Sequence, residues 1–171
     1  MLNGTPVGLD EMLRCREERA ALQKRFLSDF GGPLVSFSLN IPGPVKTTPE
    51  LRRVFERGKG EILRALEKMG VAVRHTAEKH ESTGDEFIIA AEGDASAIKK
   101  KMTAIEEEHP LGRLFDIDVI DEAGEKISRA EPRRCFLCGE AAAACARSRR
   151  HSVDELVSYM ERKIAAYFAE A

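Results

Sequence analysis

The chain carries, at positions 36–49, the stretch Ser36-Phe37-Ser38-Leu39-Asn40-Ile41-Pro42-Gly43-Pro44-Val45-Lys46-Thr47-Thr48-Pro49, which predicts a strand, a stiff loop and the start of a helix. Polar and apolar residues alternate up to Asn40, as in a strand that is buried on one face. Pro42 and Pro44 fix the backbone and remove two donors, and Gly43 permits the close approach of a ligand. This proline loop (residues 40–48), which holds Lys46, is therefore either a binding loop or a stiffened connection.

Helices and strands alternate on both sides of this stretch. A helix rich in Arg and Glu is expected over residues 9–30, before Gly31-Gly32-Pro33. Thr48 is placed to cap a helix that begins at Pro49 and is interrupted by Gly58 and Gly60. Periodicity and turn signals then predict strands at 71–78 and 86–91, a helix at 95–109, strands at 114–121 and 126–130, and a closing helix after residue 152.

The central order of strand, helix, strand, strand, helix, strand is that of ferredoxin-like folds. We predict a single α+β domain over residues 1–171, with a ferredoxin-like βαββαβ core and a mainly antiparallel sheet. An added hairpin strand and extra N- and C-terminal helices surround this core. A nucleotidyltransferase-like α/β sheet is the alternative, since it also carries pairs of acids on a strand. The Gly-Ser element that precedes those acids is missing, however, and Gly112-Arg113 lies too close to them.

The composition is that of a globular protein without a strong overall charge. Of 171 residues 43% are hydrophobic and 33% charged, and the formal net charge is −2, so an anion site has to be a local patch. No apolar run has the length of a membrane span, and no basic and apolar leader follows Met1, so we expect a cytoplasmic protein. Three of the four cysteines lie close together, which does not suggest a disulfide framework.

Two acids on one strand are candidates for a metal site. In a strand with a period of two, Asp116 and Asp118 lie on the same face, roughly 7 Å apart. Such carboxylates can share Mg²⁺, which completes its coordination with waters and substrate phosphates. The alternative is a solvated or arginine-paired face of the sheet, because two acids at this spacing are a weak signal.

The tail holds thiols and an imidazole at a spacing that resembles a zinc site. The four side chains are Cys135, Cys138, Cys145 and His151, and the first pair has the spacing of a zinc finger. The spacing from Cys138 to Cys145 and His151 is less regular. Ala141–Ala144, between the second and third thiols, is an apolar stretch with helical character. Buried thiols are therefore as good an interpretation as zinc ligands.

Arginines are concentrated in the same tail. Residues 129–151 contain six arginines against two glutamates. Arg147, Arg149, Arg150 and His151 precede the start of the last helix, where guanidinium groups and free backbone donors could together bind phosphate. The alternative is a basic turn exposed to solvent. Arg133 and Arg134 raise the number of arginines in this tail further, which favours an anion site.

Together, the segments Asn40–Lys46, Arg113–Val119 and Cys135–His151 resemble those of the apo-citrate lyase phosphoribosyl-dephospho-CoA transferases. The resemblance runs from about Gly8 to the C-terminus. It implies transfer from 2'-(5''-triphosphoribosyl)-3'-dephospho-CoA to a serine of the apo acyl carrier (gamma) subunit of citrate lyase, with release of pyrophosphate. Such a reaction requires positioning and charge neutralisation of a triphosphate.

With this resemblance in view, the candidate residues receive roles. Asp116 and Asp118 would hold Mg²⁺, and one of them would orient or deprotonate the serine. The pyrophosphate or the dephospho-CoA part would be bound by Lys46, Arg113, Arg134, Arg147, Arg149, Arg150 and His151, while Asn40 would fix the loop. The alternative is a non-catalytic module, stabilised by zinc, that binds nucleic acid or a carrier protein. Few aromatic residues and a nearly neutral charge disfavour nucleic acid.

Overall fold

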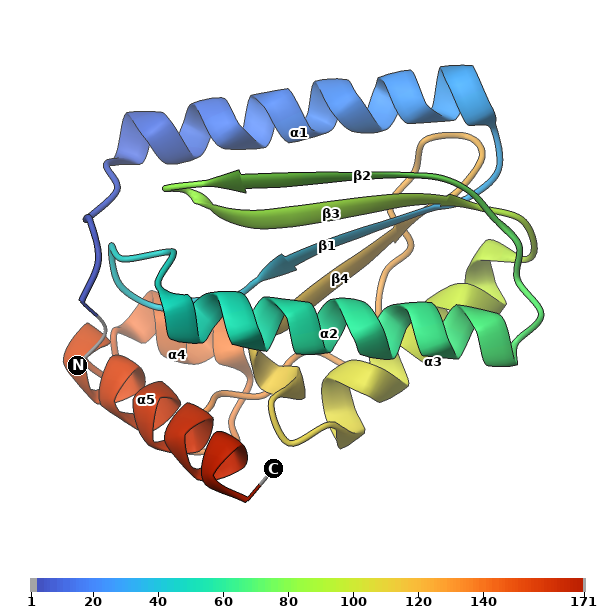
Figure 1. Cartoon of the computed structure of the whole chain (residues 1–171). Helices are drawn as coiled ribbons and strands as arrows, with labels where there is room; N and C mark the ends of the chain where they lie inside the picture. The colour runs from blue at the N-terminus through green and yellow to red at the C-terminus, as the bar shows by residue number, and fades with distance from the viewer. Residues whose placement is uncertain (1–2, 171) are drawn as a thin grey trace.

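An antiparallel sheet lies between two layers of helices in the computed structural model, which describes residues 3–170 (Figure 1). Helix α1 (Leu9–Phe30) covers one face of the sheet, and α2 (Pro49–Lys68) and α3 (Ala95–Glu108) cover the other. The four strands have the order β2-β3-β1-β4, and every neighbouring pair is antiparallel. Their bounds are Leu34–Leu39 (β1), Val73–Glu81 (β2), Gly84–Ala91 (β3) and Phe115–Ile120 (β4). The α+β class is thereby confirmed.

The chain ends in a short and a long helix after the sheet is complete. A single 3-10 turn, η1 (Gly112–Leu114), leads into β4, and α4 (Ala142–Ser148) and α5 (Val153–Ala169) follow the last strand. The expected caps are present: the Thr48 hydroxyl accepts a hydrogen bond from Leu51 N at 3.2 Å, and Ser152 forms a capping box with Glu155. None of the helices within residues 3–170 combines the length and the apolar character needed to cross a bilayer.

Alternation along the strands gives the sheet two different faces. Phe37 of β1 lies between Phe87 of β3 and Ile117 of β4, on the face that packs against α2 and α3. On the other face, Ser38 lies between Glu86 and Asp116. This polar row across three strands faces α1, near the point where β1 enters the proline loop, and it forms the floor of the site described below (Figure 1).

Close packing explains one of the two glycines in α2. Gly58 is buried, and a Cβ atom there would lie 2.5 Å from Cζ of Phe37 and 3.0 Å from Cε1 of Phe115. Gly60 has room, since the nearest atom to its Cβ position is Nη2 of Arg64 at 3.9 Å. The helix is continuous from Pro49 to Lys68, so Gly58 serves packing and neither glycine interrupts the helix.

This difference gives a matched pair of variants. We expect Gly58→Ala to lower the free energy of unfolding by about 1–3 kcal/mol, because overpacking displaces two phenylalanine rings. Gly60→Ala should leave it unchanged or raise it by up to about 1 kcal/mol, the helix-propensity gain. Urea unfolding followed by circular dichroism measures both, and equal effects of the two substitutions would contradict the packing explanation.

The expected strand at residues 126–130 is wrong. Lys126 forms one isolated bridge with Ile120, and Ile127 N donates to Val119 O at 2.9 Å. The next position is blocked by two buried side chains of α3. Glu106 accepts a hydrogen bond from Ile117 N at 2.8 Å, and Lys99 Nζ donates to Ile117 O at 2.9 Å. Because the N–H and the C=O of Ile117 are both taken, the pairing that begins at Lys126 and Ile127 cannot extend along β4 into a fifth strand.

Candidate functional site

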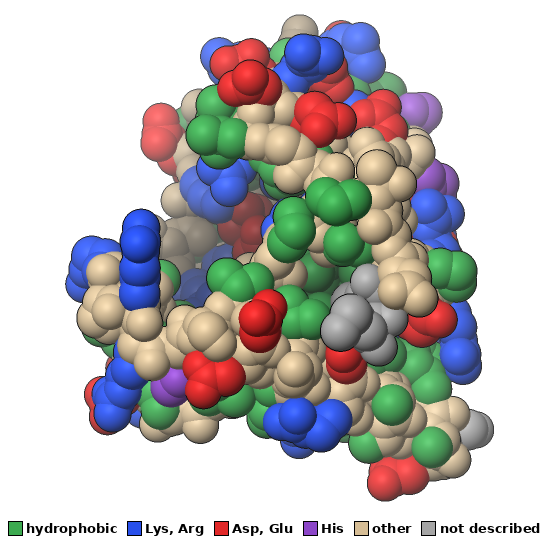
Figure 2. All heavy atoms as spheres, turned by 90° about the vertical axis from the view of Figure 1, so that its left-hand side faces the viewer, with side chains coloured by type: hydrophobic (Ala, Val, Ile, Leu, Met, Phe, Trp, Pro, Cys, Tyr) green, Lys and Arg blue, Asp and Glu red, His purple; other side chains and the backbone are tan. Residues whose placement is uncertain are grey.

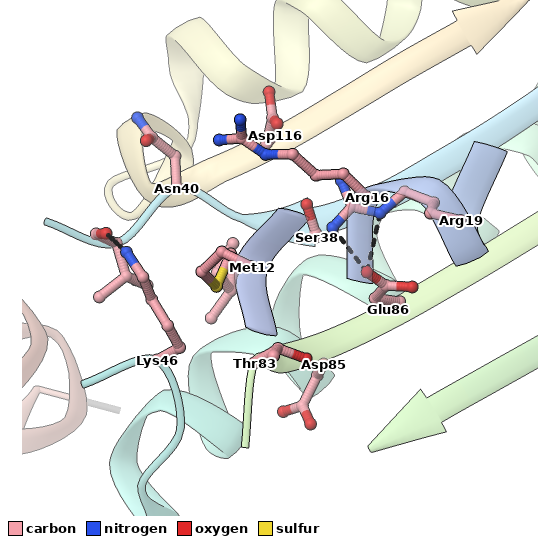
Figure 3. A pocket seen from close by; sticks show the side chains of 13 residues that line it. Met12, Arg16, Arg19, Ser38, Asn40, Lys46, Thr83, Asp85, Glu86 and Asp116 are labelled. Carbon is pink, nitrogen blue, oxygen red and sulfur yellow. Dashed lines mark hydrogen bonds and ion pairs between the residues drawn. The ribbon is translucent and has the colours of Figure 1, made fainter. Parts of the chain in front are cut away.

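A pocket of about 150 Å³ opens between α1, the proline loop and the polar row of the sheet. Figure 2 shows a hollow in this end of the molecule, with basic and acidic side chains around it. Figure 3 shows the pocket from close by. The polar side chains that line it come from α1, β1, the proline loop, the β2–β3 hairpin and β4: Arg16, Arg19, Ser38, Asn40, Lys46, Thr83, Asp85, Glu86 and Asp116.

The proline loop is braced at both ends. The Asn40 backbone N–H donates to Leu114 O at 2.8 Å, and Pro44 O accepts from Val7 N at 2.9 Å. Lys46 bends back so that its Nζ donates to Ile41 O at 2.7 Å, as Figure 3 shows. Gly43 has φ +80°, and a Cβ there would lie 3.3–3.4 Å from two valines of α5. The positive φ and the contact with α5 both favour glycine at this position.

Each of the three acids in the pocket lining, Asp85, Glu86 and Asp116, already has a cationic partner. Glu86 accepts from Nε of Arg19 at 2.8 Å, and Asp85 accepts from Nε of Arg52 at 2.6 Å. The Asp116 carboxylate lies 3.0 Å from Nη2 of Arg133. Arg16 forms neither a hydrogen bond nor an ion pair with any of residues 3–170. Two cations of the lining, Lys46 and Arg16, thus have no carboxylate partner there, which makes the pocket suitable for an anion.

The surroundings of Lys46 have a measurable consequence. Burial of the ammonium group, and secondarily the positive charge of Arg16, lower the pKa of Lys46 below that of an ordinary lysine. A bound anion would reverse the second effect, because it attracts both cations. An anion bound beside Lys46 and Arg16 would therefore stabilise the charged form of the lysine.

Of the predicted site residues, only Asn40, Lys46 and Asp116 come together in this pocket. Asp118, on the same face of β4, does not line it; its carboxylate lies 2.5 Å from Nζ of Lys126. Each of the two acids is thus paired with a cation from the segment that follows β4. Asp116 is the more accessible of the two, with 39% of its side chain exposed against 23% for Asp118.

The predicted arginines occupy two other places. Arg113 packs over Phe136 and donates to the Arg134 carbonyl, and it lines a second pocket of about 280 Å³ with residues of α5. Arg134 in turn donates to Gly139 O at 3.2 Å. Arg147, Arg149 and Arg150 are exposed at the end of α4. None of these five lines the pocket at the proline loop.

The four tail ligands expected from the sequence form a real cluster. The donor atoms of Cys135, Cys138, Cys145 and His151 all lie within 4.8 Å of one another, and the sulfurs of Cys138 and Cys145 are 3.4 Å apart. His151 Nε2 is buried and has no hydrogen-bond partner among residues 3–170. Burial raises the pKa of the Cys135 thiol, but hydrogen bonds from the backbone of Leu137 and Cys138 and from the Cys138 and Cys145 thiols together lower it by more. The set can hold one metal ion.

Comparison with known proteins decides the family. The family model for apo-citrate lyase phosphoribosyl-dephospho-CoA transferase matches residues 7–167. The chain belongs to this family. A curated protein of this name from Citrobacter koseri is 39% identical over 159 residues, which cover 91% of this chain and 87% of that protein. One from Vibrio cholerae serotype O1 (strain M66-2), named as probable, is 43% identical over 169 residues, covering 94% and 93%. One from Shigella boydii serotype 18 is 37% identical over 159 residues, covering 91% and 87%.

Membership of the phosphoribosyl-dephospho-CoA transferase family confirms the resemblance seen in the sequence; the roles of single residues stay predictions. Sequence reasoning missed the wall of the pocket that α1 supplies, with Arg16 and Arg19 one turn apart. The available signal was the spacing of Met12, Arg16 and Arg19, which places all three on one side of the helix. Exposed arginines on a helix are usually solvated, so this spacing alone does not indicate a site.

Proposed function

We propose that this chain transfers the phosphoribosyl-dephospho-CoA group from 2'-(5''-triphosphoribosyl)-3'-dephospho-CoA to a serine of the apo acyl carrier (gamma) subunit of citrate lyase. Family membership supports the reaction class, and the pocket supports the place. The observation that carries the proposal is that Lys46 and Arg16, two cations without a carboxylate partner, line one small pocket together with Asp116. A triphosphate supplies the negative charge that this pair lacks.

In this proposal the serine Oγ attacks the phosphorus next to the ribose. A new P–O bond to serine forms, the P–O bond to the departing pyrophosphate breaks, and the serine proton passes to the Asp116 carboxylate. Lys46 and Arg16 hold the pyrophosphate oxygens, where negative charge increases during transfer. Asn40, which follows β1, lines the same pocket.

We propose two metal ions with different tasks. Mg²⁺ fits the oxygen donors of Asp116 and Asn40, because it takes one or two protein oxygens and completes its coordination with waters and phosphates. When bound, it neutralises phosphate charge. Zn²⁺ fits the cysteine–histidine cluster, whose thiolates and imidazole are the donors of structural zinc sites.

The remaining arginines are assigned to the rest of the substrate. Arg147, Arg149 and Arg150, which are exposed at the end of α4 and just after it, would contact the phosphates of the dephospho-CoA part outside the pocket. Arg113 and Arg134 would act indirectly, because their guanidinium groups already brace the chain around Phe136 and Gly139. His151 lies within the cysteine cluster, so we assign it to the metal and not to phosphate.

We also propose that the chain is one domain with a ferredoxin-like core. The strand order β2-β3-β1-β4 with antiparallel neighbours supports this, as do the crossover helices α2 and α3 on one face. Helix α1 covers the face that would otherwise be open. A cytoplasmic location agrees with four free cysteines, because a reducing compartment keeps thiols available for a metal.

The direct experiment is a transfer assay. The protein is mixed with apo acyl carrier subunit, triphosphoribosyl-dephospho-CoA and Mg²⁺, and the carrier is weighed by mass spectrometry. We expect the mass of the carrier to rise by that of the prosthetic group, with release of pyrophosphate. A carrier of unchanged mass would contradict the proposed function.

The substitution Lys46→Ala tests the anion pocket. Loss of one charge-assisted hydrogen bond costs about 1.5–3 kcal/mol, so we expect KM for the triphosphate substrate to rise about 10- to 100-fold. Inhibition by added pyrophosphate should weaken by a similar factor. Because the pKa of Lys46 is lowered in the free protein, KM of the parent chain should begin to rise at a pH below the pKa of an ordinary lysine, and Lys46→Ala should lack this rise.

The matched control is Lys100→Ala, because Lys100 is an exposed lysine of α3, on the opposite face of the sheet. Its KM should equal that of the parent chain. If Lys46→Ala instead unfolds while its turnover per folded molecule is unchanged, the proline loop has a structural role only.

A further inference from the structure

Within the segment between β4 and α5, Phe136 packs against the core and Arg129 and Arg133 pair with Glu106, but the turn at 134–141 and helix α4 have few such contacts. Helix α4 has seven residues, of which only Cys145 is buried. Helices shorter than about 12–15 residues are marginal in water without other support. The backbone bonds that close the preceding turn are few: Cys135 N to Glu140 O at 2.6 Å and Ala142 N to Arg133 O at 2.8 Å. Within α4, the burial of Cys145 alone is little apolar support for a helix of this length.

A metal ion accounts for the order of the turn and of α4. Around one tetrahedral Zn²⁺, with Zn–S bonds of about 2.3 Å, sulfurs lie about 3.8 Å apart, which is close to the separations in the cluster. Buried thiols, the other interpretation of the sequence, would explain Cys145 but not Cys138, which is exposed. They also leave unexplained the buried His151 Nε2 without a hydrogen-bond partner among residues 3–170. A zinc ion would join the turn, α4 and the start of α5 at one point.

The segment closed in this way contains a residue that contacts one side chain of the pocket lining, Asp116. Arg133 lies two residues before Cys135, and its carbonyl accepts the Ala142 N–H that closes the turn. Its Nη2 contacts the buried Glu106 and lies 3.0 Å from the Asp116 carboxylate. Arg133 thus lies between the turn that holds the cluster and the acid that we place at the reacting phosphate.

We infer that Zn²⁺ bound by Cys135, Cys138, Cys145 and His151 folds residues 133–151 and thereby holds Arg133 against Asp116, so that transfer depends on a metal that never touches the substrate. The inference rests on the proposed function for the role of Asp116. Arg133 is a positioning residue here: it fixes the direction of the carboxylate. Binding of a structural zinc ion contributes folding free energy, so loss of the metal should loosen this segment and leave the sheet intact.

The metal is tested first without any activity measurement. We expect about one zinc per chain in protein purified with zinc under reducing conditions, and a thiolate-to-metal absorption band after exchange with Co²⁺. Cys138→Ala should lose both. Cys15→Ser is the matched control for metal content, because Cys15 is the cysteine outside the cluster, on the buried side of α1 against Glu86, and it should keep both signals.

Amide hydrogen exchange then measures which residues are ordered by the metal. Removal of zinc by a chelator should speed amide exchange in residues 133–151 at least about tenfold, while exchange in β1, β3 and α2 is unchanged. Protein without stoichiometric zinc, or equal exchange with and without zinc, would overturn the inference.

Arg133→Gln tests the connection to the pocket. This variant should still bind zinc, and its kcat should be reduced. Zinc removal should reduce kcat of the parent chain to a similar level but have little further effect on the variant, because the connection is already broken. If zinc removal reduces kcat by the same factor in both, or leaves the parent chain fully active, the coupling is refuted. If no form of the protein transfers the group, the proposed function fails, and zinc content and hydrogen exchange still decide the metal site.

Discussion

Asp116→Asn should nearly abolish transfer to the carrier while the protein stays folded. The substitution keeps the size and shape of the side chain but removes the charge that would accept the serine proton and bind Mg²⁺. Loss of a general base lowers rates by about 10²- to 10⁴-fold, so we expect kcat to fall within this range. The side chain is 39% exposed, and its ion pair with Arg133 is at the surface of the pocket. The free energy of unfolding should therefore change by no more than about 1 kcal/mol.

Asp118→Asn is the informative comparison. The sequence predicts that the two acids act together, whereas Asp118 lies outside the pocket lining and is paired with Lys126. We expect kcat of Asp118→Asn to fall by less than about tenfold, since it loses only indirect support for the site. An equal loss in both variants would favour a metal ion shared by the two carboxylates. Normal turnover of Asp116→Asn would remove this residue from the mechanism.

The largest loss of stability is expected from Glu106→Ala. The carboxylate is 1% exposed and is contacted by Arg129, by Arg133 and by the backbone N–H of Ile117. Truncation leaves two guanidinium groups, 14% and 21% exposed, and one backbone donor without this acceptor. Breaking a buried ion pair on one side typically costs about 3–5 kcal/mol, and we expect a decrease of this size in the free energy of unfolding.

The control for this prediction is the next residue. Glu107 also pairs with Arg129, at 2.7 Å, but 55% of its side chain is exposed. Glu107→Ala should therefore lower the free energy of unfolding by less than about 1 kcal/mol. Urea unfolding compares the two variants, and Glu106→Gln, which keeps one acceptor for Ile117, should lie between them. Similar values for Glu106→Ala and Glu107→Ala would show that burial of the ion pair contributes little.

Local patterns in the sequence predicted most of the elements. Alternation in β1 and β4, the Thr48 and Ser152 caps and the stop at Gly31-Gly32-Pro33 act over a few residues, so they can be recognised without a structure. The strand expected at 126–130 failed because Lys99 and Glu106, which are distant in sequence, occupy its pairing site. Nothing near residue 126 indicates that competition.

The site was predictable only in part, for a similar reason. Lys46 and Asp116 could be proposed one by one, but their common pocket depends on the antiparallel register of β1 and β4, where Ser38 opposes Asp116. The contribution of Arg16 depends on how α1 lies across the sheet. Both are long-range features, and the period of two along a strand does not determine them.

The two side chains of α3 that cover the outer edge of β4 also oppose self-association through that edge. A free edge strand offers backbone groups to which a strand of another copy can add, and this is a common route to aggregation. Here the ammonium of Lys99 and the carboxylate of Glu106 occupy both groups of Ile117, so an incoming strand would have to displace two buried charges. The opposite edge, β2, has no such block at its backbone from any of residues 3–170, but it carries the charged residues Arg74, Lys79 and Glu81. A chain that loses Glu106 should therefore become both less stable and more prone to join its neighbours edge to edge.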